Sequence, residues 1–373
     1  MSAVPILFVD HAAALGGAQY CLLLLLEYLD RRRFAPRLAT QPGALAEEAA
    51  RLQVPIDYVA LTRLRHQLPA PARVVRATAV LRRIILREQI ALVHHNTMRA
   101  SVAATLAAGL TRRPVVWHVH DIFRRGVYAR WMCRRSSAAI AVSAAAARPL
   151  PCHHKVHVIP NGVRLEDFSA DRHEEAAELR AQWGVPPQAP LVAQIARLQP
   201  WKGQRDVIAA AEMLLRRRSD LYFVLVGGDI FDDARSYAER LRSVAGRSEF
   251  SRRIVFAGQR TDIPVVLQAV DVLVHASIDE PFGRVLIEAG AAGVPVVAYD
   301  GGGVAEIVEH ERTGLLVPAH DQRELAAALA RVLDAPERAH AMGAAARARV
   351  SDQFDARQLT REIESVFDAA LTA

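Results

Sequence analysis

Two glutamates separated by seven residues, Glu280 and Glu288, form the strongest chemical signal in the sequence. The apolar run Val272–His275 predicts a buried strand before them, and Gly283–Gly290 predicts a helix. Glu280 then lies in the loop before the helix, where unpaired backbone amides bind anions or hydroxyls, and Glu288 lies inside the helix. Two acidic residues in an ordinary helix more often have no ligand: they interact favourably with the helix dipole near its N-terminus, or they face solvent. The turn Pro281-Phe282-Gly283 between them favours a ligand site, in which both carboxylates accept hydrogen bonds from hydroxyl groups.

Two cations, Arg197 and Lys202, follow the apolar run Leu191–Ile195. Fixed cations beyond the end of a strand can hold a diphosphate and stabilise the charge that it gains as a leaving group. Surface solvation is the common role of such residues. Lys202, however, is one of only two lysines in the chain, with Lys155 the other. The segment therefore predicts a diphosphate site.

Two further loops also come directly after predicted strands. Gly16 and Gly17 follow the apolar run Ile6–Val9, and backbone without side chains lets a phosphate or substrate approach the next helix closely. His120 follows the run Pro114–Val119, so we expect it to face a ligand. His118, two residues earlier, lies deeper in the same strand, and we predict that it is structural.

The stretch Glu280–Pro295 resembles the E-x7-E motif of the retaining family-4 glycosyltransferases, which have the GT-B fold. The loop Ala196–Gly203 is similar to the G-R-L-x-x-x-K-G loop of that family, with Ala196 where the family usually has glycine. The similarity covers nearly the whole chain. It implies two Rossmann-like domains that face a central cleft, with the donor nucleotide sugar bound by the second domain.

The resemblance also implies roles for individual residues. Arg197 and Lys202 bind the donor diphosphate, Glu280 binds the donor sugar, and His120 contacts a distal sugar hydroxyl near the anomeric centre. Glu288 can accept both hydroxyls of the ribose, and the stretch from Gly258 matches the base-binding segment, whose contacts are mainly through backbone. The predicted catalytic residues are His120, Arg197, Lys202 and Glu280, and the predicted donor-binding residues are Gly16, Gly17, Arg197, Lys202, Gly258, Arg260, Glu280, Phe282, Gly283, Arg284, Val285 and Glu288. The glycines Gly301-Gly302-Gly303 resemble the family loop that closes on the sugar and diphosphate.

We expect no metal ion and no cofactor beyond the donor substrate. The sequence has no D-x-D pair after a predicted strand and no His/Cys cluster with zinc spacing. The cationic loop and the helix termini can replace a metal. The resemblance implies a front-face displacement, in which the departing phosphate deprotonates the acceptor hydroxyl.

These residues must be positioned by an α/β fold, because short apolar runs alternate with helical segments throughout the chain. A turn at Pro160-Asn161-Gly162 separates two such series. We predict an acceptor-binding domain over 1–162, a donor-binding domain over 163–354, and a last helix over 355–371 that can pack back on either. The predicted strands are 6–9, 37–40, 56–59, 92–94, 114–119, 138–142 and 156–159 in the first domain, and 191–195, 222–226, 254–257, 272–275, 296–298 and 314–317 in the second.

Charge divides the chain in the same way. Residues 1–160 hold 22 Lys and Arg against 8 Asp and Glu, whereas residues 161–373 hold 25 against 32. A basic first half suggests an anionic partner. Because arginines alternate with aromatic residues over Ile122–Cys133, we hypothesise a peripheral contact with an anionic membrane, with a solvated arginine face as the plainer alternative. Nucleic acid is disfavoured, because no recognised binding motif accompanies the charge.

The predicted acceptor is a glycan or a lipid-linked envelope molecule, bound near Asn96, Tyr128 and Arg124 in loops of the first domain. Three scattered cysteines are expected to be reduced, and the chain start lacks the features of a signal peptide, so we expect a cytoplasmic protein, possibly peripheral on the inner face of the cell membrane.

The prediction is therefore a retaining hexosyltransferase that uses a UDP- or GDP-sugar. Two alternatives stay open: a nucleotide-sugar 2-epimerase of the same architecture, and a catalytically silent nucleotide-binding protein. A dehydrogenase is poorly supported, because the G-x-G-x-x-G fingerprint is missing.

Overall fold

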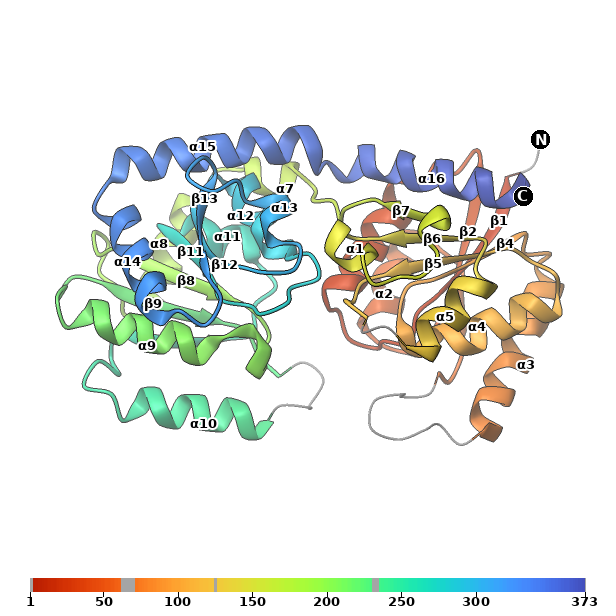
Figure 1. Cartoon of the computed structure of the whole chain (residues 1–373), viewed down its shortest axis with the longest axis horizontal. Coiled ribbons are helices and arrows are strands. Elements are labelled where there is room, and N and C mark those ends of the chain that lie inside the picture. Colours follow the sequence, from red (N-terminus) through yellow and green to blue (C-terminus); the bar gives the residue numbers. More distant parts are fainter. Residues whose placement is uncertain (1–2, 62–70, 124–125, 230–234, 373) are drawn as a thin grey trace. The chain divides into compact units, whose positions relative to one another are not determined.

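The computed structural model describes residues 3–61, 71–123, 126–229 and 235–372. The chain forms two compact units, one of residues 1–162 with 356–373 and one of residues 163–355. Each unit is a parallel sheet with helices on its faces (Figure 1). The predicted α/β class with two parallel sheets is confirmed.

The first unit contains a seven-stranded parallel sheet in the order β3-β2-β1-β4-β5-β6-β7. Its central strands are short, largely apolar runs buried on both faces, as parallel sheets require, and the edge strands β3 and β7 are more exposed. Along β1, Ile6 and Phe8 enter one core cluster while Leu7 and Val9 enter the other, because successive side chains point to opposite faces. The strands are β1 (Val4–Val9), β2 (Phe34–Thr40), β3 (Ile56–Tyr58), β4 (Leu92–His95), β5 (Val115–Val119), β6 (Ala138–Ala141) and β7 (Val156–Val158).

The last helix of the chain, α16 (Ala356–Thr372), completes this first unit. Its residues Leu359, Ile363 and Phe367 recur at helical spacing and are buried in the same cluster as Ile6 and Phe8. The other helices of the unit are α1 (Gly17–Tyr28), α2 (Ala44–Arg51), α3 (Pro71–Arg87), α4 (Met98–Leu110), α5 (Val127–Arg135), α6 (Ala144–Ala147) and the 3-10 turn η1 (His153–Lys155).

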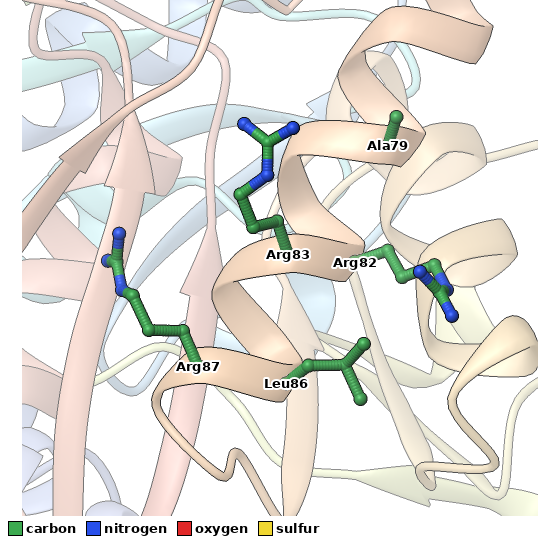
Figure 2. Close-up of a pocket in the computed structure, with 5 residues that line it drawn as sticks. All are labelled: Ala79, Arg82, Arg83, Leu86 and Arg87. Atoms are coloured by element: carbon green, nitrogen blue, oxygen red, sulfur yellow. The ribbon is translucent and has the colours of Figure 1, made fainter.

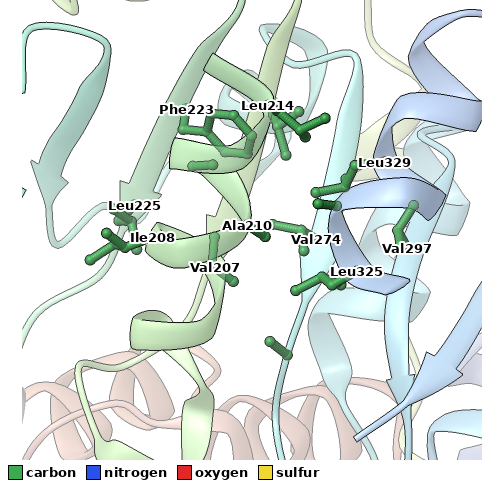
Figure 3. Close-up of a cluster of buried hydrophobic side chains, with 14 of the residues drawn as sticks. Val207, Ile208, Ala210, Leu214, Phe223, Leu225, Val274, Val297, Leu325 and Leu329 are labelled. Carbon is green, nitrogen blue, oxygen red and sulfur yellow. The ribbon is translucent and has the colours of Figure 1, made fainter. Parts of the chain in front are cut away.

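The second unit contains a six-stranded parallel sheet in the order β10-β9-β8-β11-β12-β13. Its strands are β8 (Leu191–Ile195), β9 (Tyr222–Val226), β10 (Ile254–Gly258), β11 (Val272–His275), β12 (Val296–Asp300) and β13 (Gly314–Pro318). Its helices are α7 (Glu166–Ser169), α8 (His173–Gln182), α9 (Gln204–Leu215), α10 (Arg235–Gly246), α11 (Ile263–Gln268), α12 (Arg284–Ala292), α13 (Val304–Ile307), α14 (Gln322–Leu333), α15 (Pro336–Gln353) and the 3-10 turn η2 (Pro200–Lys202). Figure 3 shows α9 and α14 packing apolar side chains against β9, β11 and β12.

The expectation of three reduced cysteines is wrong. Cys133, in the last turn of α5, and Cys152, in the loop before η1, form a disulfide with Cα atoms 5.5 Å apart. Cys21 is the free cysteine and is buried. Sequence spacing carries no signal for this pairing, because the fold brings the two segments together. The cysteines therefore no longer support the expectation of a reducing compartment.

Candidate active site

Glu280 lies at the carboxyl edge of the second sheet, between β11 and α12. Its backbone oxygen accepts a hydrogen bond of 2.8 Å from the Gly303 amide. Gly302, with φ of 59°, packs so closely that an added Cβ would lie 2.0 Å from the Glu280 carbonyl oxygen, so a side chain there is excluded. The predicted glycine loop therefore holds the backbone of Glu280 in place.

The Glu280 side chain forms an ion pair with Lys202, with 2.5 Å between Oε2 and Nζ. The two side chains are 8% and 12% exposed, and the Lys202 ammonium also lies 3.9 Å from the centre of the Trp201 ring. Burial acts to raise the pKa of Glu280, but Lys202 and the nearby His275 outweigh it and hold that pKa well below its usual value. Glu280 is therefore a carboxylate at neutral pH.

The loop that carries Arg197 and Lys202 rests on the exit of β11. Gly203 has φ of 69° at the start of α9, and an added Cβ would lie 2.0 Å from the Ala276 carbonyl oxygen. The Trp201 carbonyl accepts from the Ile278 amide at 2.8 Å. This fit brings Lys202 to Glu280 although the two lie 78 residues apart in sequence. Arg197 is close enough to lower the pKa of Lys202, after the larger effect of burial.

The remaining predicted donor residues of this unit are spread over three elements. Glu288 lies in the second turn of α12 and pairs with Arg284 one turn earlier, at 2.8 Å. Arg260, just after Gly258 at the end of β10, pairs with Asp262. Phe282 is 3% exposed and packs on Phe354, so only its backbone can meet a ligand. Gly283, with φ of 95°, begins α12, and Val285 is partly exposed in its first turn.

The carboxyl edge of the first sheet brings together Asp10, Asn96 and His120 from the ends of β1, β4 and β5. Asn96 Nδ2 donates to Asp10 Oδ2 at 2.8 Å and to the Ala18 carbonyl at 2.9 Å. Its Oδ1 then faces His120 Nε2 at 2.9 Å, so this ring nitrogen carries the hydrogen. Asp10 also accepts from Gln19, whose Oε1 in turn accepts from the Gly16 amide at the start of α1.

The buried histidines behind this edge are held neutral. His118 stacks on His120, with ring centres 4.3 Å apart, and its Nδ1 lies 3.2 Å from His94 Nε2. Burial lowers the pKa of His118 and of His95 to about 3, and burial together with the neighbouring rings lowers that of His94 well below its usual value. His94 and His95 are both fully buried in β4, which extends one residue beyond its predicted end at His94.

Two of the predicted acceptor residues, Asn96 and Tyr128, make hydrogen bonds to other side chains of the protein. Asn96 is 1% exposed and engaged with Asp10, and the Tyr128 hydroxyl lies 2.8 Å from Ser101 Oγ. Burial raises the pKa of Tyr128. Tyr128 and Phe123 pack on Trp117, so these aromatic rings of the basic segment turn inward. Arg124 lies outside the described residues.

Sequence reasoning missed three polar residues at these two edges: Asp10, Gln19 and His275. Asp10 and His275 are the residues at which a predicted apolar strand meets its loop, which is the signal that could have identified them. Gln19 followed the predicted glycines and was passed over as an ordinary helix residue.

The two units match two family models. Residues 175–349 match the model described as glycosyl transferases group 1, and residues 15–167 match the model described as glycosyltransferase family 4. The chain belongs to this glycosyltransferase family. The predicted recognition and the GT-B fold class are therefore confirmed.

Curated relatives support this membership. A D-inositol 3-phosphate glycosyltransferase of Nocardia farcinica is 31% identical over 266 residues, which cover 69% of this chain and 56% of that protein. A GDP-mannose-dependent α-(1-6)-phosphatidylinositol monomannoside mannosyltransferase of Mycobacterium tuberculosis is 35% identical over 205 residues, which cover 52% and 51%. The chain thus spans about half the length of these curated relatives.

A solved structure matches over a longer range. The Anabaena protein HepE in complex with UDP-glucose has a TM-score of 0.87 and 27% identity, covering 98% of this chain and 99% of that one. Within the described residues, no helix is long and apolar enough to cross a membrane. The same part of the chain contains no group of three or more His, Cys, Asp or Glu residues arranged to hold a metal ion.

Proposed function

We propose that this glycosyltransferase moves a hexose from a UDP- or GDP-sugar to a glycan or lipid-linked acceptor, with retention of configuration and without a metal ion. The observation that carries the proposal is the Lys202–Glu280 pair at the carboxyl edge of the second sheet. Ligands of open α/β sheets bind at this edge. The relatives support the donor class, since one is named for GDP-mannose and HepE was solved with UDP-glucose.

The donor site uses both members of the pair. The ammonium of Lys202 has three hydrogens, so it can keep its bond to Glu280 and still donate to a diphosphate beside Arg197. Glu280 accepts from a sugar hydroxyl, and Glu288 accepts from the ribose. The base lies along Gly258 and Arg260, where backbone contacts predominate.

The chemical step is a displacement at the anomeric carbon. The bond from this carbon to the diphosphate oxygen breaks, and the bond to the acceptor oxygen forms on the same face of the ring. The acceptor proton passes to the departing phosphate, so atoms and charge balance without a protein nucleophile. Arg197 and Lys202 stabilise the charge that develops on the diphosphate.

The stereochemistry of the product tests the reaction against its alternatives. Proton NMR of the reaction with an α-linked donor sugar should show an α-linked product immediately after mixing. A β-linked first product contradicts retention. Release of a free 2-epimer indicates the epimerase, and an unchanged donor in the presence of candidate acceptors indicates the silent protein.

We also propose a peripheral contact with an anionic membrane. We assign this contact to α3, in place of the basic segment 122–133. Along α3, Ala72, Val75, Ala79 and Leu86 share one exposed face, with Val75 66% and Leu86 50% exposed. Exposed arginines border this face: Arg73, Arg76, Arg82, Arg83 and Arg87. Figure 2 shows Arg83 and Arg87 extending to one side of the helix, and Ala79, Arg82 and Leu86 to the other. Arginines beside an apolar stripe favour an anionic lipid surface.

Flotation with vesicles containing anionic lipid tests the membrane contact. We expect binding that weakens with salt and that falls at least about tenfold when Arg76, Arg82 and Arg83 are changed to glutamate. The matched control changes Arg130, Arg134 and Arg135, which are exposed on α5 within and directly after the basic segment 122–133. A larger loss in the α5 control assigns the contact to that segment, and no binding by the unaltered protein refutes the membrane contact.

A further inference from the structure

His275 is a buried histidine that the proposed donor site leaves without a role. It is the last residue of β11, and its side chain is 2% exposed. Its Nε2 lies 3.3 Å from Glu280 Oε2, the same oxygen that Lys202 contacts. Neither ring nitrogen makes a hydrogen bond in the described part of the chain, so Nε2 and Oε2 lie close together without the alignment of a hydrogen bond. Because a carboxylate oxygen only accepts, the group of His275 that can meet it from this side is an N–H at Nε2.

Both contacts are made to the same oxygen of the Glu280 carboxylate. Oε2 receives the Lys202 ammonium and faces His275, while Oε1 makes no hydrogen bond to any described residue. A carboxylate oxygen can accept from two donors, so Oε2 can take both Lys202 and His275 while Oε1 is available to a ligand. The His275 contact is longer than a charge-assisted hydrogen bond and is poorly aligned, and such contacts commonly shorten and align when a ligand binds.

A second contact to the Glu280 carboxylate matters because Lys202 has two proposed partners, Glu280 and the donor diphosphate. When a donor diphosphate is bound, its negative charge draws the ammonium away from Glu280 and weakens that bond. His275 has no such competing partner, since burial in β11 keeps it beside Oε2. A carboxylate held by one flexible lysine would rotate, whereas one held also by a rigid strand residue keeps its orientation.

We propose that His275 is a positioning residue for Glu280: its Nε2–H fixes Oε2 from the side opposite to substrate, so that Oε1 is presented to a hydroxyl of the donor sugar. This inference rests on the proposed function, because it requires that Glu280 bind the sugar. It predicts that loss of His275 affects recognition of the sugar and leaves recognition of the nucleotide intact. A residue that only fills the core would affect both equally.

The test compares affinities for UDP-glucose and UDP, and for GDP-mannose and GDP, by titration calorimetry. For the donor that binds, His275→Leu should weaken nucleotide-sugar affinity about tenfold, equal to about 1.4 kcal/mol, with nucleoside diphosphate affinity within about twofold of the unaltered protein. His275→Gln retains an N–H donor and should restore most of the loss. Glu280→Gln is the reference for loss of the carboxylate, and it should show a selective loss at least as large.

The matched control is His95→Leu in the first unit. His95 is also the last residue of its strand, is fully buried, and has no hydrogen-bonded ring nitrogen in the described residues. Its replacement should change thermal stability without changing the ratio of nucleotide-sugar to nucleotide affinity.

The outcomes distinguish the positioning role of His275 from the proposed sugar contact of Glu280. If Glu280→Gln shifts the ratio and His275→Leu does not, or if His275→Gln fails to restore it, the positioning role is overturned and the proposed donor site stands. If Glu280→Gln leaves the ratio unchanged, or no donor binds, the proposed sugar contact fails and the role of His275 fails with it.

Discussion

The two sheets each bring one buried carboxylate to their carboxyl edge, but they treat its charge in opposite ways. Asp10 of the first unit accepts from the Ala12 amide and from the neutral side chains of Gln19 and Asn96, and burial raises its pKa. Glu280 of the second unit is paired with Lys202, which holds its pKa well below the usual value despite burial.

The comparison shows that one architecture supports two kinds of chemistry. Neutral amides and histidines recognise uncharged groups and fix each other's orientation, as in the chain from Asp10 through Asn96 to His120. A buried ion pair with unused donors and acceptors can receive a diphosphate and a sugar hydroxyl together. This difference leads us to assign the donor to the second unit.

The largest expected effect follows removal of the cation of the pair. Lys202→Ala leaves Glu280 buried with one weak contact, and we expect kcat/KM for transfer to fall by about 10²–10³-fold. The free energy of unfolding should fall by about 3 kcal/mol, because breaking one side of a buried pair strands the other charge. Lys155→Ala is the control, since this lysine lies in the first unit and donates to the Ser136 carbonyl. Activity within tenfold of the unaltered enzyme in Lys202→Ala would contradict the assignment.

The next largest effect concerns a covalent link that is present in the first unit and absent from the second. The Cys133–Cys152 disulfide lies in the first unit, and the sequence of the second unit contains no cysteine. With a sequence separation of 19 between the cysteines, Cys152→Ser should cost about 3 kcal/mol of unfolding free energy. Urea denaturation measures this loss, and affinity for the donor nucleotide should not change. Cys21→Ser provides the control for loss of a buried thiol. A loss of donor affinity in Cys152→Ser would show that the two edges are coupled.

The smallest effect is a difference of sign between the two carboxylates. Glu280 has a lowered pKa, so its stabilisation is present above its unfolded value of 4.5 and is lost as the pH falls. Asp10 has a raised pKa, so its contribution is present below its unfolded value of 3.8 and is lost as the pH rises through the folded value. Glu280→Gln should therefore flatten the loss of stability in acid by about 1 kcal/mol, and Asp10→Asn should steepen that loss. Urea denaturation midpoints between pH 3.5 and 6.5 measure how the stability of each variant changes with pH. If both variants changed this pH dependence in the same direction, the contrast between Glu280 and Asp10 would be contradicted.

Strands were predictable because buried parallel strands are continuous apolar runs, and β8, β9 and β11 match their predicted bounds. The helices α5, α8 and α15 were not predicted. The helices α8 and α15 are rich in alanine and charged residues, so their apolar stripes are faint, and α5 is short, with three arginines among its nine residues. The boundary of β4 was missed because histidine is a weak strand signal, although both His94 and His95 are buried.

The candidate site was predictable where residues form a motif and not where they act singly. Glu280 and Lys202 belong to patterned loops, and the fold brings them into contact. Asp10 and His275 have no patterned neighbours, so only the structure reveals their partners. Phe282 lies within the motif, but its orientation depends on packing against Phe354, 72 residues later in the chain.

The central claim is that the Lys202–Glu280 edge binds the donor nucleotide sugar without a metal ion. Titration calorimetry with UDP-glucose and GDP-mannose in the presence of EDTA, on the unaltered protein and on Lys202→Ala, tests it most directly. We predict binding of one donor by the unaltered protein and a loss of at least about tenfold in the variant, because charged hydrogen bonds contribute about 1.5–3 kcal/mol. Binding that requires a divalent cation, or equal affinity in the two proteins, would contradict the account.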